Sequence, residues 1–257
     1  MKKIYLGTVS MEKNRWEPGR VPTFNVSDFI DKAMADGFDG IELWEYHYTH
    51  ATDEEKAKLA ASGVPFIFNS YISLVERNEE AFKEIADAVK AIGATAIKFN
   101  LGPSWVEEID VPSQVENLKY FASLLPENVK LLCECHPNTV MEVPENAGKV
   151  FDELDKDRFG AIIHLATEND FIDRCYAAYG DRLCHMHCAY QTENAEGKKE
   201  FAAMNDGTGF VEDKINYYIG KGFDGTLTIE FVKFEDTAEA HYEHAVDNMK
   251  YLRTLYK

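Results

Sequence analysis

The chain has 257 residues, 45% of them hydrophobic, and a formal net charge of −18. This composition argues against disorder, and the length suits one large α/β barrel or two ordinary domains. The negative charge repels phosphate backbones and anionic lipid, so we expect neither nucleic acid nor a membrane as partner.

No apolar run approaches the roughly 18 residues of a membrane span, and the first residues do not follow the pattern of a signal peptide. The five cysteines form no CxxC pair, which is typical of reduced thiols. We therefore expect a cytoplasmic protein.

Short β-rich runs alternate with helical patterns along the whole chain. The runs are KIYLGTVS, GIELW, PFIFNSY, AIKFNLG, VKLLCECH, FGAIIHLA, LCHMHCAY and GTLTIEFV. Eight such alternations predict parallel βαβ units, and we expect one domain over residues 1–257 that closes into a (β/α)8 TIM barrel. A doubly wound open sheet is the alternative, but no glycine-rich phosphate-binding turn follows the first run.

Helix caps can be identified between several of these runs. Ser27 is a possible N-cap of the first helix, and Gly37 marks its end. Capping boxes are expected at Thr52 with Glu55 and at Ser113 with Glu116.

Polar residues recur on one face near the ends of the last four predicted strands. Because side chains alternate along a strand, the residues Glu134, His164, His187 and Glu230 would all point into the barrel, near the C-terminal mouth where barrel enzymes hold their active sites. The alternate positions hold apolar residues or thiols, which we expect to pack under the helices. No cysteine is therefore predicted to be a ligand.

Two carboxylates and two imidazoles that converge would suit a divalent metal ion. Mixed nitrogen and oxygen ligands fit Mn²⁺, Fe²⁺, Co²⁺ or Zn²⁺ better than Mg²⁺ or Ca²⁺, and the ion would offset the cost of burying both carboxylates. A single histidine in a strand is more often a hydrogen-bonded core residue. The prediction therefore depends on the same inward-pointing polar position recurring in four consecutive strands. We predict one ion, Mn²⁺, with Co²⁺, Zn²⁺, Fe²⁺ or Mg²⁺ as alternatives.

The same alternation predicts a substrate pocket around these ligands. Its predicted substrate-binding residues are Glu42, Asn69, Lys98, His136 and His185, with Trp44 and Asn100 as further lining. Glu42 could simply neutralise Lys98, whereas Lys98 could instead stabilise an enolate oxygen or a carboxylate. His136 and His185 could also orient the metal ligands.

Aromatic residues and one long polar segment follow the predicted strands. Trp16, Trp105 and Phe201 are candidates for stacking on a sugar ring, with core packing as the alternative. Residues 191–210 are either a lid that excludes water or a solvated insertion.

The chain resembles the xylose isomerase-like sugar isomerases and epimerases, a superfamily that also includes endonuclease IV. LLCECHPN is similar to the Glu-x-His-Pro strand end of that family, LCHMHCAY to its His-x-His strand end, and GFDGIELW to its second strand. The tail GTGFVEDKINYYIGKGFDGTLTIEF is similar to its Gly-x-Gly, helix, Gly-Phe/Tyr-x-Gly, strand and Glu pattern. This resemblance implies one metal ion held by Glu134, the sixth-strand residue, His187 and Glu230, with Glu134 and Glu230 as the catalytic acid and base.

The sixth strand departs from the family pattern, which usually ends Asp-x-Gly-His. Here His164 occupies the aspartate position, and Thr167 takes the place of a histidine that contacts substrate. A site with two glutamates and two histidines carries one negative charge less, so the ion should be a stronger Lewis acid.

The predicted function is that of a metal-dependent isomerase or epimerase of a sugar or keto-sugar, working by proton abstraction next to a chelated carbonyl. A lyase or dehydratase acting on a keto-sugar, a 3-keto-glycoside or an inosose would use the same ligands. A non-catalytic barrel that binds a sugar or a partner is a third hypothesis, and a nuclease is the weakest. Assembly into a homo-oligomer or with a partner subunit is left open.

Overall fold

The computed structural model describes residues 2–102 and 111–257. Over these residues, eight parallel strands form a closed barrel in the order β1-β10-β7-β6-β5-β4-β3-β2, and helices alternate with them along the chain. The predicted (β/α)8 TIM barrel is confirmed. No helix in the described ranges is long and apolar enough to cross a membrane.

Contacts between Cα atoms group the chain into two compact units. Unit 1 comprises residues 1–65, 164–166 and 186–257, and unit 2 comprises residues 66–163 and 167–185. The strands β6 (Phe159–His164) and β7 (Leu183–Cys188) begin in unit 2 and end in unit 1. The expectation of a single domain over residues 1–257 stays a prediction.

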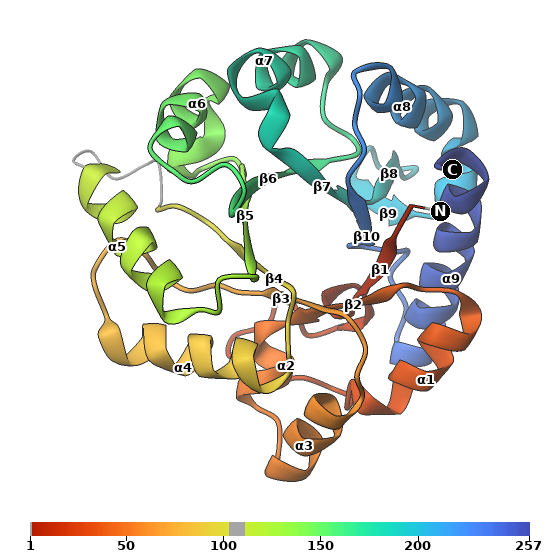
Figure 1. Cartoon of the computed structure of the whole chain (residues 1–257). Coiled ribbons are helices and arrows are strands. Elements are labelled where there is room, and N and C mark those ends of the chain that lie inside the picture. The colour runs from red at the N-terminus through yellow and green to blue at the C-terminus, as the bar shows by residue number, and fades with distance from the viewer. Residues whose placement is uncertain (1, 103–110) are drawn as a thin grey trace. The chain divides into compact units, whose positions relative to one another are not determined.

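Unit 1 contains the first two strands, the last barrel strand and the helices that pack against them. In Figure 1, α1 and α9 lie along the outer side of β1. The elements are β1 (Ile4–Gly7), η1 (Thr8–Met11), α1 (Ser27–Asp36), β2 (Gly40–Trp44), α2 (Glu45–Thr49), α3 (Asp53–Ala61), β8 (Tyr190–Glu193), β9 (Lys199–Ala202), η4 (Met204–Gly207), α8 (Thr208–Gly220), β10 (Thr226–Ile229) and α9 (Ala238–Leu255).

The end of β1 lies close against the end of β10. Leu6 pairs with Ile229 in the parallel register, and Gly7 follows it. A Cβ atom on Gly7 would lie 2.6 Å from the carbonyl oxygen of Ile229, so a larger residue would push the two strands apart. This glycine therefore helps to fix the position of Glu230, the next residue after Ile229.

The helix caps of unit 1 differ in part from the expected ones. Gly37 does end α1, with a positive φ of 110° that glycine adopts at little cost. Ser27 is the first helical residue rather than the N-cap, because Glu55 accepts hydrogen bonds from its N–H and hydroxyl groups. Thr52 caps α3 by accepting the N–H of Glu55, so this capping box is only half formed.

The polar segment after β7 contains an antiparallel hairpin that the sequence analysis did not predict. Strands β8 and β9 pair from Tyr190 opposite Ala202 to Glu193 opposite Lys199. The turn between them begins with Asn194, whose side chain accepts the N–H groups of Glu196 and Lys198. The role of this segment as a lid stays a prediction.

Unit 2 contains β3, β4, β5, the first parts of β6 and β7, and the helices that follow them. In Figure 1, α4, α5 and α6 lie outside β3, β4 and β5. The elements are β3 (Phe66–Asn69), α4 (Glu79–Ala91), β4 (Ala96–Phe99), α5 (Val111–Leu124), β5 (Lys130–Glu134), η2 (Val140–Glu142), α6 (Pro144–Asp152), the first part of β6, α7 (Asn169–Tyr179), η3 (Gly180–Arg182) and the first part of β7.

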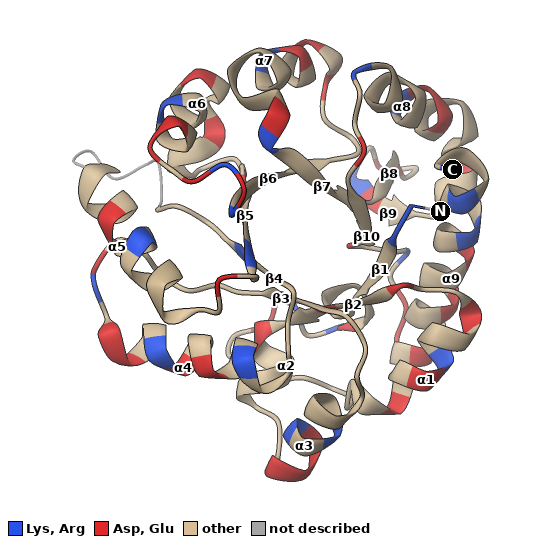
Figure 2. Ribbon diagram, in the orientation of Figure 1, with Lys and Arg blue, Asp and Glu red and all other residues tan. Residues whose placement is uncertain are grey.

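Local sequence explains how α4 starts, and it fails to predict the start of α5. Asn78 caps α4 by accepting the N–H of Ala81 through its side chain, and Glu79 and Glu80 occupy the first turn. Acidic and basic positions alternate along this helix in Figure 2. The expected capping box at Ser113 is wrong, because α5 already includes Val111 and Ser113 therefore lies inside the helix.

Candidate metal centre

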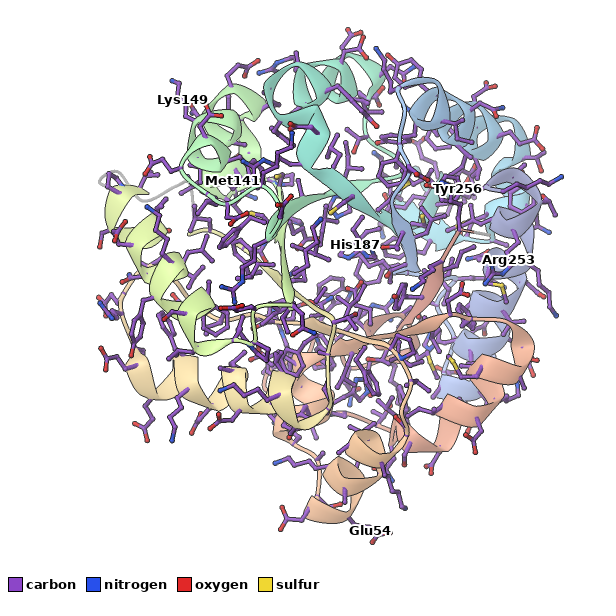
Figure 3. The ribbon with its side chains drawn as sticks, viewed as in Figure 1. Glu54, Met141, Lys149, His187, Arg253 and Tyr256 are labelled. Carbon is purple, nitrogen blue, oxygen red and sulfur yellow. The ribbon has the colours of Figure 1, made fainter. Side chains whose placement is uncertain are left out.

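His187 of β7 is the most enclosed of the predicted ligands in unit 1. Its side chain is 0% exposed, and its Nδ1 atom lies 3.2 Å from Oε1 of Glu230. Figure 3 shows His187 on the inner side of the strands, away from Arg253 of the outer helix α9. The backbone aligns the two residues, since the N–H of Glu230 donates to the carbonyl of Cys188.

Glu42 of β2 lies on the other side of the same imidazole. Its Oε1 atom is 3.1 Å from Nε2 of His187, and this carboxylate is 1% exposed. A histidine that gives its Nε2 proton to a carboxylate presents Nδ1 as a lone-pair donor. Glu42, predicted as a substrate contact, therefore lies where it would orient His187.

His164 ends β6 and is the third predicted ligand in unit 1. Its Nε2 atom lies 3.9 Å from Oε2 of Glu230, and its side chain is 30% exposed. The N–H of Leu165 donates to the carbonyl of His187, and the hydroxyl of Tyr218 donates to the carbonyl of His164. These two bonds fix the end of β6 beside β7.

The residues of unit 1 fit a divalent cation. Potential ligand atoms of His164, His187 and Glu230 lie within 4.8 Å of one another. With Nε2 of His187 donating to Glu42, Nδ1 and Oε1 of Glu230 would face each other as two electron-pair donors. A shared cation relieves that repulsion, and this mixed nitrogen and oxygen set suits a transition metal.

Glu134 lies in unit 2, where two side chains hold its carboxylate. Nζ of Lys98 is 2.8 Å from Oε2 of Glu134, and Nδ2 of Asn100 donates to the same oxygen at 3.2 Å. Lys98 also donates to Oδ1 of Asn100 at 2.8 Å. Both Lys98 and Glu134 are buried, so the ion pair compensates the cost of burying either charge.

The other predicted pocket residues differ in their environment. Asn69, at the end of β3, and His185, in β7, are buried. His136 is exposed, and its N–H bonds back to the carbonyl of Glu134. Because β5 ends at Glu134, strand alternation does not extend to His136. Substrate binding by all of these residues stays a prediction.

The cysteines of the described residues are not members of the groups that could hold a metal. The Tyr179 hydroxyl of α7 donates to Sγ of Cys175 at 3.0 Å. Burial raises the pKa of Tyr179, and the neighbouring thiols of Cys135 and Cys175 raise it further. Cys135 therefore lies near α7, although it follows the end of β5 and strand alternation does not apply to it.

A second buried network in unit 1 was not predicted from the sequence. His47 of α2 lies between Oγ1 of Thr8, at 3.0 Å, and Oε1 of Glu12, at 2.9 Å. Glu12 also accepts the N–H and hydroxyl of Thr23, and Thr8 accepts the N–H of Trp44. Burial lowers the pKa of His47. These residues lie in loops and a short helix, where neither strand nor helix periodicity applies.

Aromatic rings gather in unit 1 beside Glu230. The ring of Phe231 lies 5.7 Å from that of Trp16 and 4.8 Å from that of Phe201. The guanidinium of Arg15 lies 5.4 Å from the ring of Phe231. Trp16 is 67% exposed, and its stacking on a sugar stays a prediction. Trp105 lies outside the described residues.

Comparisons with solved structures found several barrels of similar fold. The probable 3-DHS dehydratase AsbF from Bacillus anthracis has a TM-score of 0.70 and 18% identity, with 98% of this chain and 99% of that chain covered. The IOLI protein with a binding zinc atom has a TM-score of 0.70 and 15% identity, with 100% and 99% covered. D-psicose 3-epimerase in the presence of D-fructose has a TM-score of 0.68 and 14% identity, with 99% of each chain covered.

At these identities the likeness concerns the fold alone. A comparison with curated proteins found no match. The family model described as xylose isomerase-like TIM barrel matches residues 30–254, which is most of the chain. The chain therefore belongs to the xylose isomerase-like TIM barrel family.

Proposed function

We propose that this protein is a divalent-metal-dependent isomerase or epimerase of a sugar or keto-sugar. The observation that carries the proposal is the arrangement of His187 between Glu42 and Glu230, with His164 beside Glu230. Such a buried set of imidazoles and carboxylates suits a catalytic metal ion better than a purely structural network. The proposed ion is Mn²⁺, and the proposed location is the cytoplasm.

Glu134 is proposed as the fourth ligand. In the register of β5 and β6, Glu134 lies opposite Ile162, two residues before His164. Residues two apart on a strand point to the same face, so His164 lies on the face shared by Ile162 and Glu134. This supports a set of Glu134, His164, His187 and Glu230.

When bound, the ion would act as a Lewis acid that polarises a carbonyl or hydroxyl oxygen of the substrate. The remaining chemistry belongs to side chains of the chain. One of Glu134 and Glu230 takes a proton from the carbon next to the carbonyl, and the other returns one. The Lys98 ammonium offers a positive charge to the oxygen that becomes negative in this step.

Solved structures of similar fold support a sugar-like substrate without defining it. One of them is an epimerase in the presence of D-fructose, and another holds a zinc atom. Asn69, His136 and His185 are proposed to bind the substrate, together with Lys98 and Glu42.

Elimination is the second candidate, and the position of Lys98 favours it. A lyase or dehydratase needs a proton donor for the leaving oxygen, and the buried ammonium beside Glu134 is suitably charged for that task. Its substrate would be a keto-sugar, a 3-keto-glycoside or an inosose. A third possibility, a barrel that binds sugar without chemistry, would leave the buried glutamates without a catalytic role.

Solvent deuterium tests the proposal. The manganese-loaded protein is incubated in D₂O with a panel of keto-sugars. The products are separated, and their molecular masses are measured by mass spectrometry. We expect deuterium next to a carbonyl, because both reactions begin by removing a carbon-bound proton. Unchanged mass apart from deuterium indicates an isomerase or epimerase, and loss of water or of an aglycone indicates a lyase.

Two variants assign the bases, and one serves as control. Glu134→Gln and Glu230→Gln should each reduce turnover by roughly 10²–10⁴-fold or more, whereas Glu17→Gln, on an exposed loop, should leave turnover unchanged. Full turnover of both active-site variants loaded with metal would exclude the two-glutamate mechanism. Absence of turnover and of exchange across the panel, despite sugar binding, would favour the non-catalytic barrel.

A further inference from the structure

The ion pair between Lys98 and Glu134 is unusual because Glu134 is also a proposed metal ligand. Lys98 Nζ lies 2.8 Å from Oε2 of Glu134, and the two side chains are 3% and 7% exposed. Little solvent is therefore present to screen either charge. Any divalent ion on this carboxylate would experience the field of the ammonium.

Asn100 forms hydrogen bonds with both members of this ion pair in unit 2. Its Oδ1 accepts from Lys98 at 2.8 Å, and its Nδ2 donates to Oε2 of Glu134 at 3.2 Å. The ring of Tyr71 lies 4.7 Å from the ammonium, a distance at which a ring face attracts a cation. Lys98 therefore has two neighbours besides Glu134 that can hold its charge.

We propose that Lys98 competes with the metal ion for Glu134, so that metal binding releases the ammonium from this carboxylate, leaves it beside Asn100 and Tyr71, and makes it available to the substrate. The proposal rests on the metal site described under the proposed function. Two positive charges beside one buried carboxylate repel each other. The ion, which carries the larger charge, takes the carboxylate, and the ammonium becomes available to a negatively charged oxygen.

The partner exchange gives Lys98 two opposite effects. It weakens metal binding, because the ion must displace an established ion pair. It favours substrates that develop or carry a negative oxygen, because the displaced ammonium, held beside Asn100 and Tyr71, can then attract that oxygen. A merely structural lysine would produce neither effect, since its removal would only lower stability.

Calorimetric titration with Mn²⁺ alone tests the competition after the protein has been freed of metal with a chelator. Lys98→Met removes the charge and keeps the length of the side chain, and we expect it to bind Mn²⁺ at least about 10-fold more tightly. Lys98→Arg keeps the charge and should bind as the wild type does. Lys130→Met makes the same charge change at the start of β5, about 13 Å along the strand from Glu134, and should also bind as the wild type does.

The outcomes separate this proposal from the proposed function. Equal or weaker Mn²⁺ binding by Lys98→Met overturns the competition and leaves the metal site standing. No binding by either the wild type or Lys98→Met overturns both.

A second measurement follows Lys98 directly in the wild-type protein. Lysine side chains labelled with ¹⁵N are followed by NMR during a Zn²⁺ titration, with the Lys98 signal assigned through its loss in Lys98→Arg. We expect that signal to shift as the ion binds. A signal unchanged at saturating Zn²⁺ would show that the bond to Glu134 survives, and would refute the exchange.

Discussion

Replacing Glu42 by glutamine should weaken metal binding although Glu42 is not among the four proposed ligands. Glu42 lies 3.1 Å from Nε2 of His187, and Nδ1 of that ring faces Glu230. Glutamine keeps the shape of the side chain. It removes the negative charge that fixes the Nε2 proton and makes Nδ1 a better electron donor.

The size of the effect follows from the kind of contact that is lost. Removing a carboxylate that orients a ligating histidine typically costs 10–100-fold in metal affinity, or roughly 1.4–2.7 kcal/mol. Both side chains are at most 1% exposed, so solvent cannot replace the lost partner. We therefore expect Glu42→Gln near the upper end of that range.

The assay is competition between the protein and a fluorescent chelator for Mn²⁺, with urea unfolding to show that the variant is folded. Glu17→Gln makes the same change of charge on an exposed loop and should leave the affinity within about twofold. If Glu42→Gln binds Mn²⁺ as tightly as Glu17→Gln, then Glu42 does not orient a metal ligand and the inferred tautomer of His187 is wrong.

Two further predictions concern the buried network around His47. Glu12→Ala leaves the ring of His47 and both donors of Thr23 without their acceptor. Urea unfolding should therefore show a free energy of unfolding lower by about 3–5 kcal/mol. A decrease no larger than that of Glu17→Ala would contradict this. Burial lowers the pKa of His47 from 6.5, so its contribution to stability is complete above about pH 6.5 and is lost as the pH falls through the lower folded pKa. His47→Gln should therefore reduce the change in unfolding free energy between about pH 7 and pH 5, whereas His50→Gln, at an exposed position, should not.

The sequence predicts the barrel well because its signals are local and repeated. Each β-rich run coincides with a strand of the barrel, and the helix ends at Gly37 and Thr52 follow rules that involve neighbouring residues only. Ser27 shows where such rules stop. Its cap is supplied by Glu55, 28 residues away in sequence, and local spacing carries no information about that partner.

The candidate site was predictable to the extent that strand alternation determines direction. His187 and Glu230 are in contact as expected, because both lie within or directly after regular strands. Alternation gives a face but not a partner, so the pairing of Glu42 with His187 and of Lys98 with Glu134 required the structure. Strand alternation also stops at the last residue of a strand, so it does not apply to His136, which follows the end of β5.

Two groups of buried carboxylates in unit 1 differ in the side chains that surround them. Glu12 accepts hydrogen bonds from both donors of Thr23, contacts His47 and lies near the buried guanidinium of Arg15. His187 instead lies between two carboxylates, and one neutral imidazole has a single proton to share between Glu42 and Glu230. The same rule, that a buried charge needs a partner, is thus met at Glu12 by Thr23, His47 and Arg15, and at Glu230 it supports the additional cation that we propose. Among the carboxylate–imidazole contacts of unit 1 in the described part of the chain, the one at the ends of β7 and β10 is therefore the one that we propose as a metal centre.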